Sequence, residues 1–334
     1  MSVASDLFDR QLRDLRISVT DRCNFRCTYC MPKEIFGPGY EFLPRNELLT
    51  FSEIETLVGH FVARGVHKVR ITGGEPLLRK GIEDLIAGIA ALDRVDDLTL
   101  TTNGSLLDRK APILAEAGLD RVTVSLDAMD EPTFQAMNDV GYPVSAVLEA
   151  IEVAAAAGLG PVKVNAVIKK GVNEHAVVDM ARHFRGTGHI VRFIEFMDVG
   201  NTNGWRLDDV VPAEQMIEMI HAEYPVEPIP PNYPGEVANR FRYVDGAGEI
   251  GVIASVTKPF CGSCTRARVS AEGSLYTCLF ASSGTSLRDV MRSGGDVGQV
   301  IDDVWAKRDD RYSEVRSANT SRLSVPVEMS YIGG

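Results

Sequence analysis

Short runs of β-branched and other apolar residues alternate with amphipathic segments between about residue 15 and residue 197. The apolar runs predict strands at residues 15–20, 68–72, 98–102, 121–126, 162–168 and 190–196. Between the strands, apolar residues at helical spacing predict helices at residues 52–63, 82–92, 108–117, 145–157 and 176–184. A repeated order of strand and then helix implies an α/β fold with a parallel sheet.

The pattern changes after residue 197. A helix is predicted at residues 213–222, followed by a proline-rich passage at 225–234 and short strands at 241–244, 251–255, 267–270 and 275–279. A turn at residues 271–274 joins the last two strands. We therefore predict a second, smaller unit that begins near residue 200 and divides the chain into residues 1–200 and 201–334.

Periodicity alone does not decide whether the parallel sheet is an open doubly wound sheet or part of a barrel. In both architectures the loops at the carboxyl ends of the strands carry the chemistry. The first three cysteines follow the first predicted strand directly, which is the expected position for a site.

The chain has 334 residues, 45% of them hydrophobic and 24% charged, and a net charge of -11. No apolar run approaches the roughly twenty residues that a membrane helix needs, and the first residues do not resemble a secretory signal. We therefore expect a cytoplasmic location. The negative charge argues against general binding to nucleic acid or anionic membranes, although a local basic pocket can still bind a phosphorylated small molecule.

All six cysteines fall into two groups of three. In the first group, three residues separate Cys23 from Cys27 and two separate Cys27 from Cys30. Three thiolates on one short loop can hold three corners of a cubic iron-sulfur cluster and leave one iron without a protein ligand. Structural zinc needs a fourth ligand, and none lies nearby in the sequence. Disulfides are less typical of a reducing cytoplasm.

In the second group, Cys261 and Cys264 form a close pair, and thirteen residues separate Cys264 from Cys278. This spacing implies a second cluster with an open iron, and zinc with an unseen histidine remains an alternative. Arg266 and Arg268 alternate on a predicted strand, so both side chains project from one face. Beside an open metal site they indicate a polyphosphate substrate; the alternative is a pair of solvated arginines.

The first cysteine group, with Tyr29 just before its last member, resembles the motif of the radical S-adenosylmethionine superfamily. The glycine-rich stretch 73–76, directly after a predicted strand, is similar to the superfamily's element beside the methionyl amine of the cofactor. The resemblance implies that S-adenosylmethionine chelates the open iron and is cleaved to a 5'-deoxyadenosyl radical. The implied cofactor contacts are Tyr29, Gly74, Glu75, Ser125 and Met197. Without the resemblance, Ser125 would be a strand hydroxyl and Met197 a core side chain.

Nearly the whole chain resembles the GTP 3',8-cyclase family, which opens molybdenum cofactor biosynthesis. The most similar stretches are 15–23, 192–200, 261–268 and the carboxyl end 331–334. The resemblance implies an incomplete TIM-like (β/α)6 parallel barrel in residues 1–200, with the first 4Fe-4S cluster. A smaller C-terminal α+β domain in residues 201–334 would close the open side of the barrel and hold the second 4Fe-4S cluster.

The same resemblance assigns residues to the substrate. The implied catalytic residues are Arg16, Arg266 and Arg268. The implied GTP contacts are Arg16, Arg70, Thr101, Lys163, Arg266, Ala267 and Arg268. Lys68 and Arg192 are weaker candidates on a physical ground, because they are cations on predicted strands and should point toward the loop end. The second cluster would hold the guanine base, and the terminal Gly333 and Gly334 would belong to a tail that enters the site.

The implied partners are a one-electron donor of the flavodoxin or ferredoxin type and a downstream cyclic pyranopterin monophosphate synthase that receives the product. A homodimer is compatible with the resemblance, whereas nucleic acid and membrane are not implied. Two alternatives remain compatible with the sequence. One is a two-cluster radical S-adenosylmethionine peptide maturase, and the other is a noncatalytic zinc-binding module.

Overall fold

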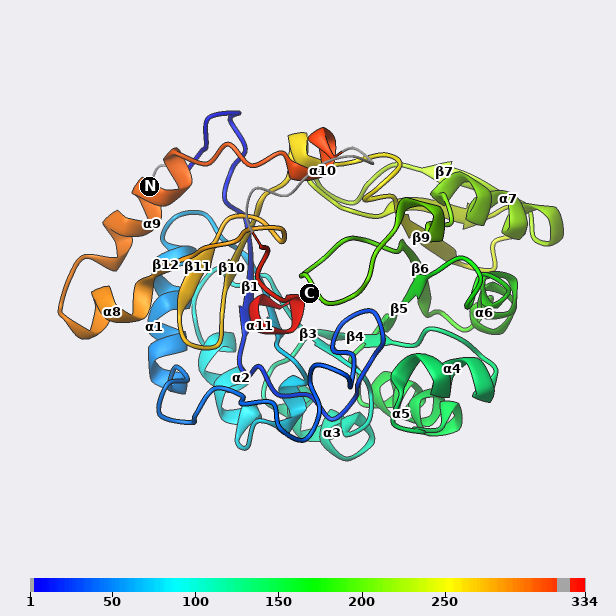
Figure 1. The fold of residues 1–334 in the computed structure, drawn as a ribbon, viewed down its shortest axis with the longest axis horizontal. Helices are drawn as coiled ribbons and strands as arrows, with labels where there is room; N and C mark the ends of the chain where they lie inside the picture. The colour runs from blue at the N-terminus through cyan, green and yellow to red at the C-terminus, as the bar shows by residue number, and fades with distance from the viewer. Residues whose placement is uncertain (1–2, 317–324, 334) are drawn as a thin grey trace.

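The computed structural model describes residues 3–316 and 325–333. At its centre, eight neighbouring strands form the parallel part of one twisted sheet (Figure 1). In sheet order these strands are β10 (Arg266–Val269), β1 (Asp14–Ser18), β2 (Lys68–Thr72), β3 (Asp97–Thr102), β4 (Arg121–Ser125), β5 (Lys163–Ile168), β6 (Ile190–Glu195) and β9 (Glu249–Ile253). Each neighbouring pair in this series is parallel.

Antiparallel strands extend the sheet at both ends. Beyond β10 lie β11 (Ser274–Tyr276) and β12 (Thr285–Ser286), and beyond β9 lie β8 (Asn239–Tyr243) and β7 (Val226–Ile229). Within the described residues β12 and β7 do not pair with each other, so hydrogen bonds do not close the sheet. The predicted α/β class with an incomplete parallel barrel is confirmed.

Helices cover the outer side of the curved sheet (Figure 1). Those between the strands of the barrel are α1 (Phe51–Val62), α2 (Ile82–Ala90), α3 (Leu107–Glu116), α4 (Glu131–Asn138), α5 (Val144–Ala156) and α6 (Ala176–Phe184). Later in the chain come α7 (Ala213–Glu223), α8 (Leu287–Arg292), α9 (Val297–Ala306), α10 (Tyr312–Val315) and α11 (Met329–Ile332). In the described part of the chain, short 3-10 turns occur at Pro76–Leu78, Leu207–Asp209 and Cys261–Ser263.

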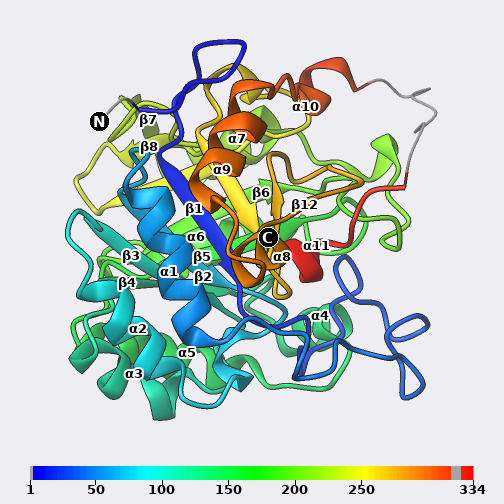
Figure 2. The same ribbon diagram turned by 90° about the vertical axis from the view of Figure 1, so that its left-hand side faces the viewer.

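Helix α1 shows how the sequence specifies these elements. Thr50 and Glu53 form a capping box that satisfies backbone donors at the start of the helix. The apolar side of the helix, at Ile54, Leu57 and Phe61, is buried against the sheet. Figure 2 shows that helix α9, late in the chain, packs beside α1, so the second part of the chain contacts the helical layer of the first.

The predicted strands and helices of the first part are confirmed within two residues at each end, and β2 and α6 match in full. Helix α4 was not predicted, although Asp130 caps it and Pro132 occupies its first turn. In the second part, β9 and β10 continue the barrel sheet on its two sides. The division at residue 200 stays a prediction, since strands from both sides of that position share one sheet. Among the described residues, no helix is both long enough and apolar enough to cross a membrane.

Candidate active site

Both cysteine groups line one cavity of ≈ 270 Å³ inside the barrel. The first group follows β1, whereas Cys261 and Cys264 precede β10 and Cys278 follows β11. Since β1 pairs directly with β10, the sheet brings the two groups to the same chamber. All six thiols are free and partly buried. The structure therefore unites the two groups that the sequence separates widely.

The donor set of each group fits three corners of an iron-sulfur cluster. Thiolates are the usual ligands of such clusters, and each iron corner takes one cysteine. Within residues 3–316 and 325–333, no three His, Cys, Asp or Glu side chains converge on a point where a single metal ion would bind. A four-iron cluster does not require its cysteines to meet at one atom.

The glycine-rich stretch after β2 packs against the first cysteine loop. The amide of Gly74 donates to the carbonyl of Thr20 at 2.7 Å, and the amide of Glu75 donates to the carbonyl of Arg22 at 2.8 Å. A Cβ atom on Gly74 would collide with the backbone of Arg22. Glycine is therefore needed here for contact with the protein's own loop, in addition to any approach to a ligand.

Glu75 is buried at the wall of the cavity, with 1% of its surface exposed. Its carboxylate accepts hydrogen bonds from the Thr102 hydroxyl at 2.8 Å, the Asn103 amide at 2.7 Å and the Leu77 amide at 3.0 Å. Burial raises the pKa of Glu75 to about 7, against the opposing effect of these donors. Because a carboxylate offers about four acceptor positions, one further donor can bind.

Tyr29 connects the first cysteine loop to the next strands of the barrel. Its hydroxyl donates to Asp127 Oδ2 at 2.9 Å, and Asp127 Oδ1 accepts the amide of Val167 at 2.9 Å. Burial raises the pKa of Asp127 to about 6. Sequence reasoning did not identify Asp127 as a site residue, nor Asn103, whose amide nitrogen lies 3.8 Å from Cys23 Sγ. Both follow the carboxyl end of a barrel strand, which was the available signal.

Three arginines lie side by side in the chamber. The sheet register pairs Arg16 with Arg268 on one side and with Arg70 on the other. All three line the cavity, together with Arg266. Burial, and then the neighbouring charges of Arg268 and Arg70, hold the pKa of Arg16 well below its usual value. The row concentrates positive charge inside an otherwise acidic protein.

A polar layer continues from this row across β3 to β6. Arg70 Nη1 donates to the hydroxyls of Thr101 and Thr123, each at 3.1 Å. Arg192 Nε donates to Asn165 Oδ1 at 2.9 Å. Thr101, Asn165 and Arg192 all line the cavity, so the weaker candidate Arg192 lies among the predicted substrate contacts.

Three other predicted contacts do not line the cavity. Lys68 and Lys163 begin β2 and β5, so they occupy the amino ends of their strands. Lys68 donates to the Tyr233 hydroxyl at 2.6 Å and pairs with Asp97 at 3.1 Å. The side chain of Ala267 is fully buried and points to the opposite face of β10 from its neighbouring arginines. None of these three side chains lines the cavity as described.

Arg266 lies against the second cysteine group. Its Nε and Nη2 atoms lie 3.4 and 3.2 Å from Cys264 Sγ. Burial acts to raise the pKa of Cys264, but the charges of Arg266 and Arg308 prevail and lower it to about 6. Burial raises the pKa of Cys23 to about 12 and that of Cys278 to about 11. Among these three thiols, Cys264 is the one poised to ionise near neutral pH.

The remaining cofactor candidates and the tail also reach this chamber. Ser125 at the end of β4 and Met197 just after β6 line the cavity, as do Met329 and Ser330 of α11. Arg268 Nη1 donates to the carbonyl of Gly333. The expected insertion of the tail is thus confirmed as far as Gly333, and Gly334 lies outside the described residues.

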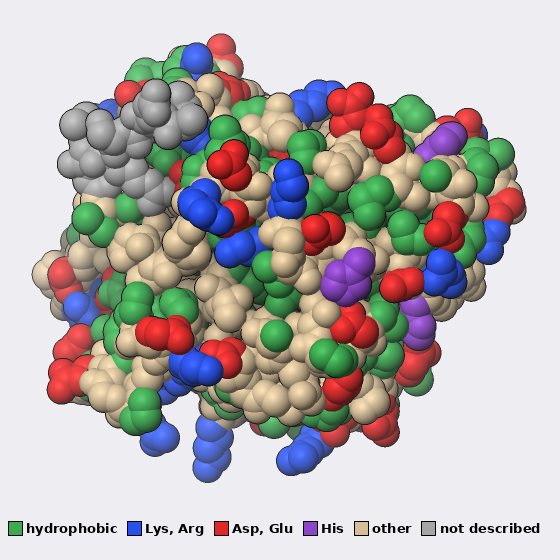
Figure 3. Space-filling view, turned by 45° about the vertical axis from the view of Figure 1, so that its right-hand side comes forward, with side chains coloured by type: hydrophobic (Ala, Val, Ile, Leu, Met, Phe, Trp, Pro, Cys, Tyr) green, Lys and Arg blue, Asp and Glu red, His purple; other side chains and the backbone are tan. Residues whose placement is uncertain are grey.

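The outer surface differs from the chamber in its charge. On the face drawn in Figure 3, acidic and basic side chains are interspersed, and no continuous basic surface covers it. On this face, therefore, the surface offers no counterpart to the arginine row of the interior.

Comparisons with known proteins agree with this arrangement. A model of the Radical SAM superfamily matches residues 17–184, and a model named Molybdenum Cofactor Synthesis C matches residues 189–314. Among solved structures, Streptococcus suis SuiB bound to S-adenosylmethionine is similar, with a TM-score of 0.64 and 15% identity over 93% of this chain and 69% of that chain. At this identity the likeness concerns the fold alone.

Relatives found by sequence are much more similar to this chain than SuiB is. A GTP 3',8-cyclase from Acidothermus cellulolyticus is 53% identical, over 98% of each chain. Another from Xanthomonas campestris pv. campestris is 51% identical, over 98% of this chain and 97% of the relative. By this identity and coverage, the chain belongs to the GTP 3',8-cyclase family of the radical S-adenosylmethionine superfamily.

Proposed function

We propose that this protein converts GTP to (8S)-3',8-cyclo-7,8-dihydroguanosine 5'-triphosphate, the first step of molybdenum cofactor biosynthesis. The observation that most directly supports this proposal is a single chamber lined by both cysteine groups and by a row of arginines. The relatives that match the whole chain bear the name of this activity. In the reaction a hydrogen atom leaves ribose C3', C3' bonds to C8 of guanine, and one electron from the donor with one proton completes the dihydro product at N7.

Cys23, Cys27 and Cys30 hold one 4Fe-4S cluster in this proposal, and Cys261, Cys264 and Cys278 hold another. With S-adenosylmethionine bound, the first centre supplies a 5'-deoxyadenosyl radical. The residues proposed to hold S-adenosylmethionine are Tyr29, Gly74, Glu75, Ser125 and Met197. The free acceptor capacity of Glu75 supports its role as the partner of the cofactor's ammonium group.

The arginines bind and orient the nucleotide in this proposal. Arg16, Arg70 and Arg268 contact the triphosphate from neighbouring strands, because guanidinium groups bind phosphate oxygens in pairs. Arg266 lies between this row and Cys264 and thus lies beside the second cluster, which holds the base. Thr101 and Lys163, together with the backbone of Ala267, complete the contacts. Fixing the ribose between the two centres supplies the orientation that ring closure needs.

The chamber also protects reactive species. Its arginine and threonine side chains are engaged with one another inside the barrel, and Arg268 is only 3% exposed. Exclusion of water prevents side reactions of radicals. The electron donor of flavodoxin or ferredoxin type, the downstream cyclic pyranopterin monophosphate synthase and a homodimer remain proposals, as does the division into residues 1–200 and 201–334.

An anaerobic assay tests the proposed function. Reconstituted protein given S-adenosylmethionine, GTP and dithionite should form 5'-deoxyadenosine and the cyclic nucleotide in a GTP-dependent manner. ATP is the matched control, because it carries the same triphosphate on another purine. No GTP-dependent 5'-deoxyadenosine would reject the activity, and iron analysis that gives about four irons per chain would reject the second cluster.

The binding of GTP should weaken as the pH rises through about 7. Burial, and then the neighbouring charges led by that of Arg192, lower the pKa of Lys163 to about 7, so Lys163 loses its charge above that pH. Losing a charged hydrogen bond costs about 1.5–3 kcal/mol, so the dissociation constant should rise by at least about 10-fold. Equilibrium binding of GTP across a pH series measures the change.

Arginine at this position provides the control for Lys163. A Lys163→Arg variant keeps its charge throughout the pH series, so its GTP affinity should lack the loss seen for the wild type. The ionisation of GTP itself affects both proteins equally. If the two proteins showed the same pH profile, Lys163 would not contact the triphosphate.

A further inference from the structure

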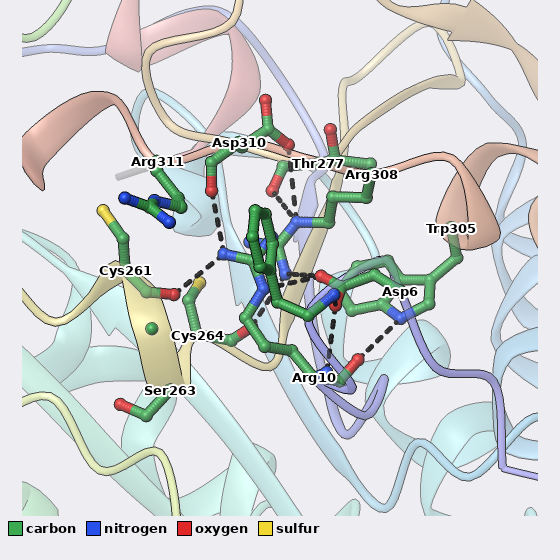
Figure 4. A network of polar contacts seen from close by, with 12 residues as sticks. Asp6, Arg10, Cys261, Ser263, Cys264, Thr277, Trp305, Arg308, Asp310 and Arg311 are labelled. Carbon is green, nitrogen blue, oxygen red and sulfur yellow. Dashed lines mark hydrogen bonds and ion pairs between the residues drawn. The ribbon is translucent and has the colours of Figure 1, made fainter. Parts of the chain in front are cut away.

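A buried ion network lies behind the second cysteine group (Figure 4). Asp6 Oδ2 accepts from Arg10 Nε at 2.6 Å and from Arg308 Nη1 at 3.1 Å. The exposed fractions are 6% for Asp6 and 4% for each arginine. We call these three residues the Asp6 clamp. They come from the first residues of the chain and from the segment after α9.

The clamp reaches the backbone of all three segments that carry the second cysteines. Arg10 Nη1 donates to the carbonyl of Cys261 at 2.8 Å, and Arg308 Nη1 donates to the carbonyl of Cys264 at 2.8 Å. Arg308 Nε donates to the carbonyl of Thr277, the residue before Cys278, at 3.1 Å. Each cysteine of the group is therefore fixed at its own or its preceding peptide.

Neighbouring contacts hold the clamp rigidly. The indole of Trp305 donates to the carbonyl of Arg10 at 3.1 Å, and the guanidinium of Arg308 lies over the Trp305 ring at 4.6 Å from its centre. Arg10 Nη1 also donates to the carbonyl of Asp310 at 2.8 Å. Asp6 Oδ1 accepts the amides of Phe8 and Arg10, each at 2.9 Å.

Burying this ion network costs desolvation free energy, so stability alone does not account for it. Desolvation of two guanidinium groups and a carboxylate offsets most of their attraction, so a buried ion network contributes little net stability over apolar packing. Its geometry has another use, since the donors converge on the carbonyls beside the cysteines. Asp310 also pairs with Arg308, at 3.4 Å, so two carboxylates balance the two guanidinium charges behind the sulfur atoms.

We propose that the Asp6 clamp is a positioning device for the second cluster, with Arg308 as its central positioning residue. The clamp fixes the three cysteines before the cluster assembles and then retains the cluster. This inference rests on the proposed function, because it requires the second cysteine group to bind a cluster. It assigns Asp6 and Arg10 to the support of the nucleotide site, although they lie far from the second cysteine group in sequence.

The test isolates the second cysteine group. A Cys23→Ala, Cys27→Ala, Cys30→Ala protein can assemble only the second cluster, so iron analysis should give about four irons per chain. In this background Arg308→Lys keeps the charge but loses the planar fork. Loss of groups that orient ligands typically costs about 10- to 100-fold in metal affinity. The half-time of iron loss to a chelator should therefore shorten by about 10-fold, with an altered electron paramagnetic resonance signal after reduction.

A second variant and a matched control complete the design. Asp6→Asn breaks both ion pairs and keeps the Oδ1 acceptor, so it should also accelerate iron loss. It provides the test if circular dichroism shows that Arg308→Lys does not fold. The control is Arg64→Lys, because Arg64 also joins the first half of the chain to α9, through Asp302 at 2.8 Å, without contact to the cysteines. This control should keep the wild-type half-time.

The outcomes distinguish a clamp without a role from a second cysteine group that binds no cluster. If Arg308→Lys and Asp6→Asn both kept the wild-type half-time and resonance signal, the clamp would have no role toward the cluster. If the triple cysteine variant with a native clamp bound no iron, the second cluster and the two-cluster function would be rejected, and the inference with them. With the first cysteines restored, Arg308→Lys should still form 5'-deoxyadenosine without GTP, since the first group is untouched.

Discussion

Replacement of Cys27 by alanine is expected to abolish the formation of 5'-deoxyadenosine, with or without GTP. Cys27 is the middle member of the first cysteine group, and its loss leaves two thiolates for a cluster that has only three protein ligands. Without that cluster no electron reaches S-adenosylmethionine. Anaerobic product analysis after reconstitution measures the loss, which should bring 5'-deoxyadenosine below detection.

Cys264 provides the matched comparison on the other side of the same chamber. A Cys264→Ala protein should still cleave S-adenosylmethionine slowly without GTP, but it should lose stimulation by GTP and the cyclic product. Iron content should fall by about half in both variants. Full cyclisation by either variant would contradict the roles proposed for the two groups.

Replacement of Arg268 by alanine should reduce cyclisation by about 10²- to 10³-fold, the usual effect of removing one preorganised donor to a charged group. Arg268 is almost fully buried beside Arg16, and it donates to the carbonyl of Gly333. The variant removes one charge from the row and the contact to the tail. Both clusters should still assemble, so turnover falls while iron content stays at about eight irons per chain.

Two further variants show whether the form of the cation matters. Arg268→Lys keeps the charge but cannot bind two phosphate oxygens in a planar pair, so it should recover only part of the turnover. Arg109→Ala is the surface control, since the Arg109 side chain is 79% exposed on α3. Equal turnover of Arg268→Ala and Arg109→Ala would mean that the arginine row does not act on the substrate.

Much of the barrel could be predicted because each of its strands and helices is specified by residues that are neighbours in the sequence. Each barrel strand is a short apolar run before an amphipathic helix, and the cysteine spacing occupies eight consecutive residues from Cys23 to Cys30. Helix α4 was missed because Pro132 reads as a helix breaker, whereas in the first turn it needs no amide partner. The pairing of β1 with β10 is a contact between distant segments, and strand propensity carries no information about such pairing.

In the site, too, local sequence patterns were predictable and contacts between distant segments were not. The alternation on β10 correctly predicted that Arg266 and Arg268 share a face, and the same alternation turns Ala267 away from the chamber. The position of Arg16 next to Arg268 required the register of two distant strands. The role of Asp6 could not be predicted, because nothing near it in the sequence indicates that Arg308 pairs with it.

The unpaired ends of the sheet have a consequence for how a large nucleotide gets in and out. In the described part of the chain, β12 and β7 are separate edges, so a seam runs along the barrel wall. Spreading this seam breaks no ladder of backbone hydrogen bonds, whereas opening a closed barrel would sacrifice a whole row of them. We therefore expect the nucleotide to enter along this seam, because widening it leaves the backbone hydrogen bonds between the arginine-bearing strands in place.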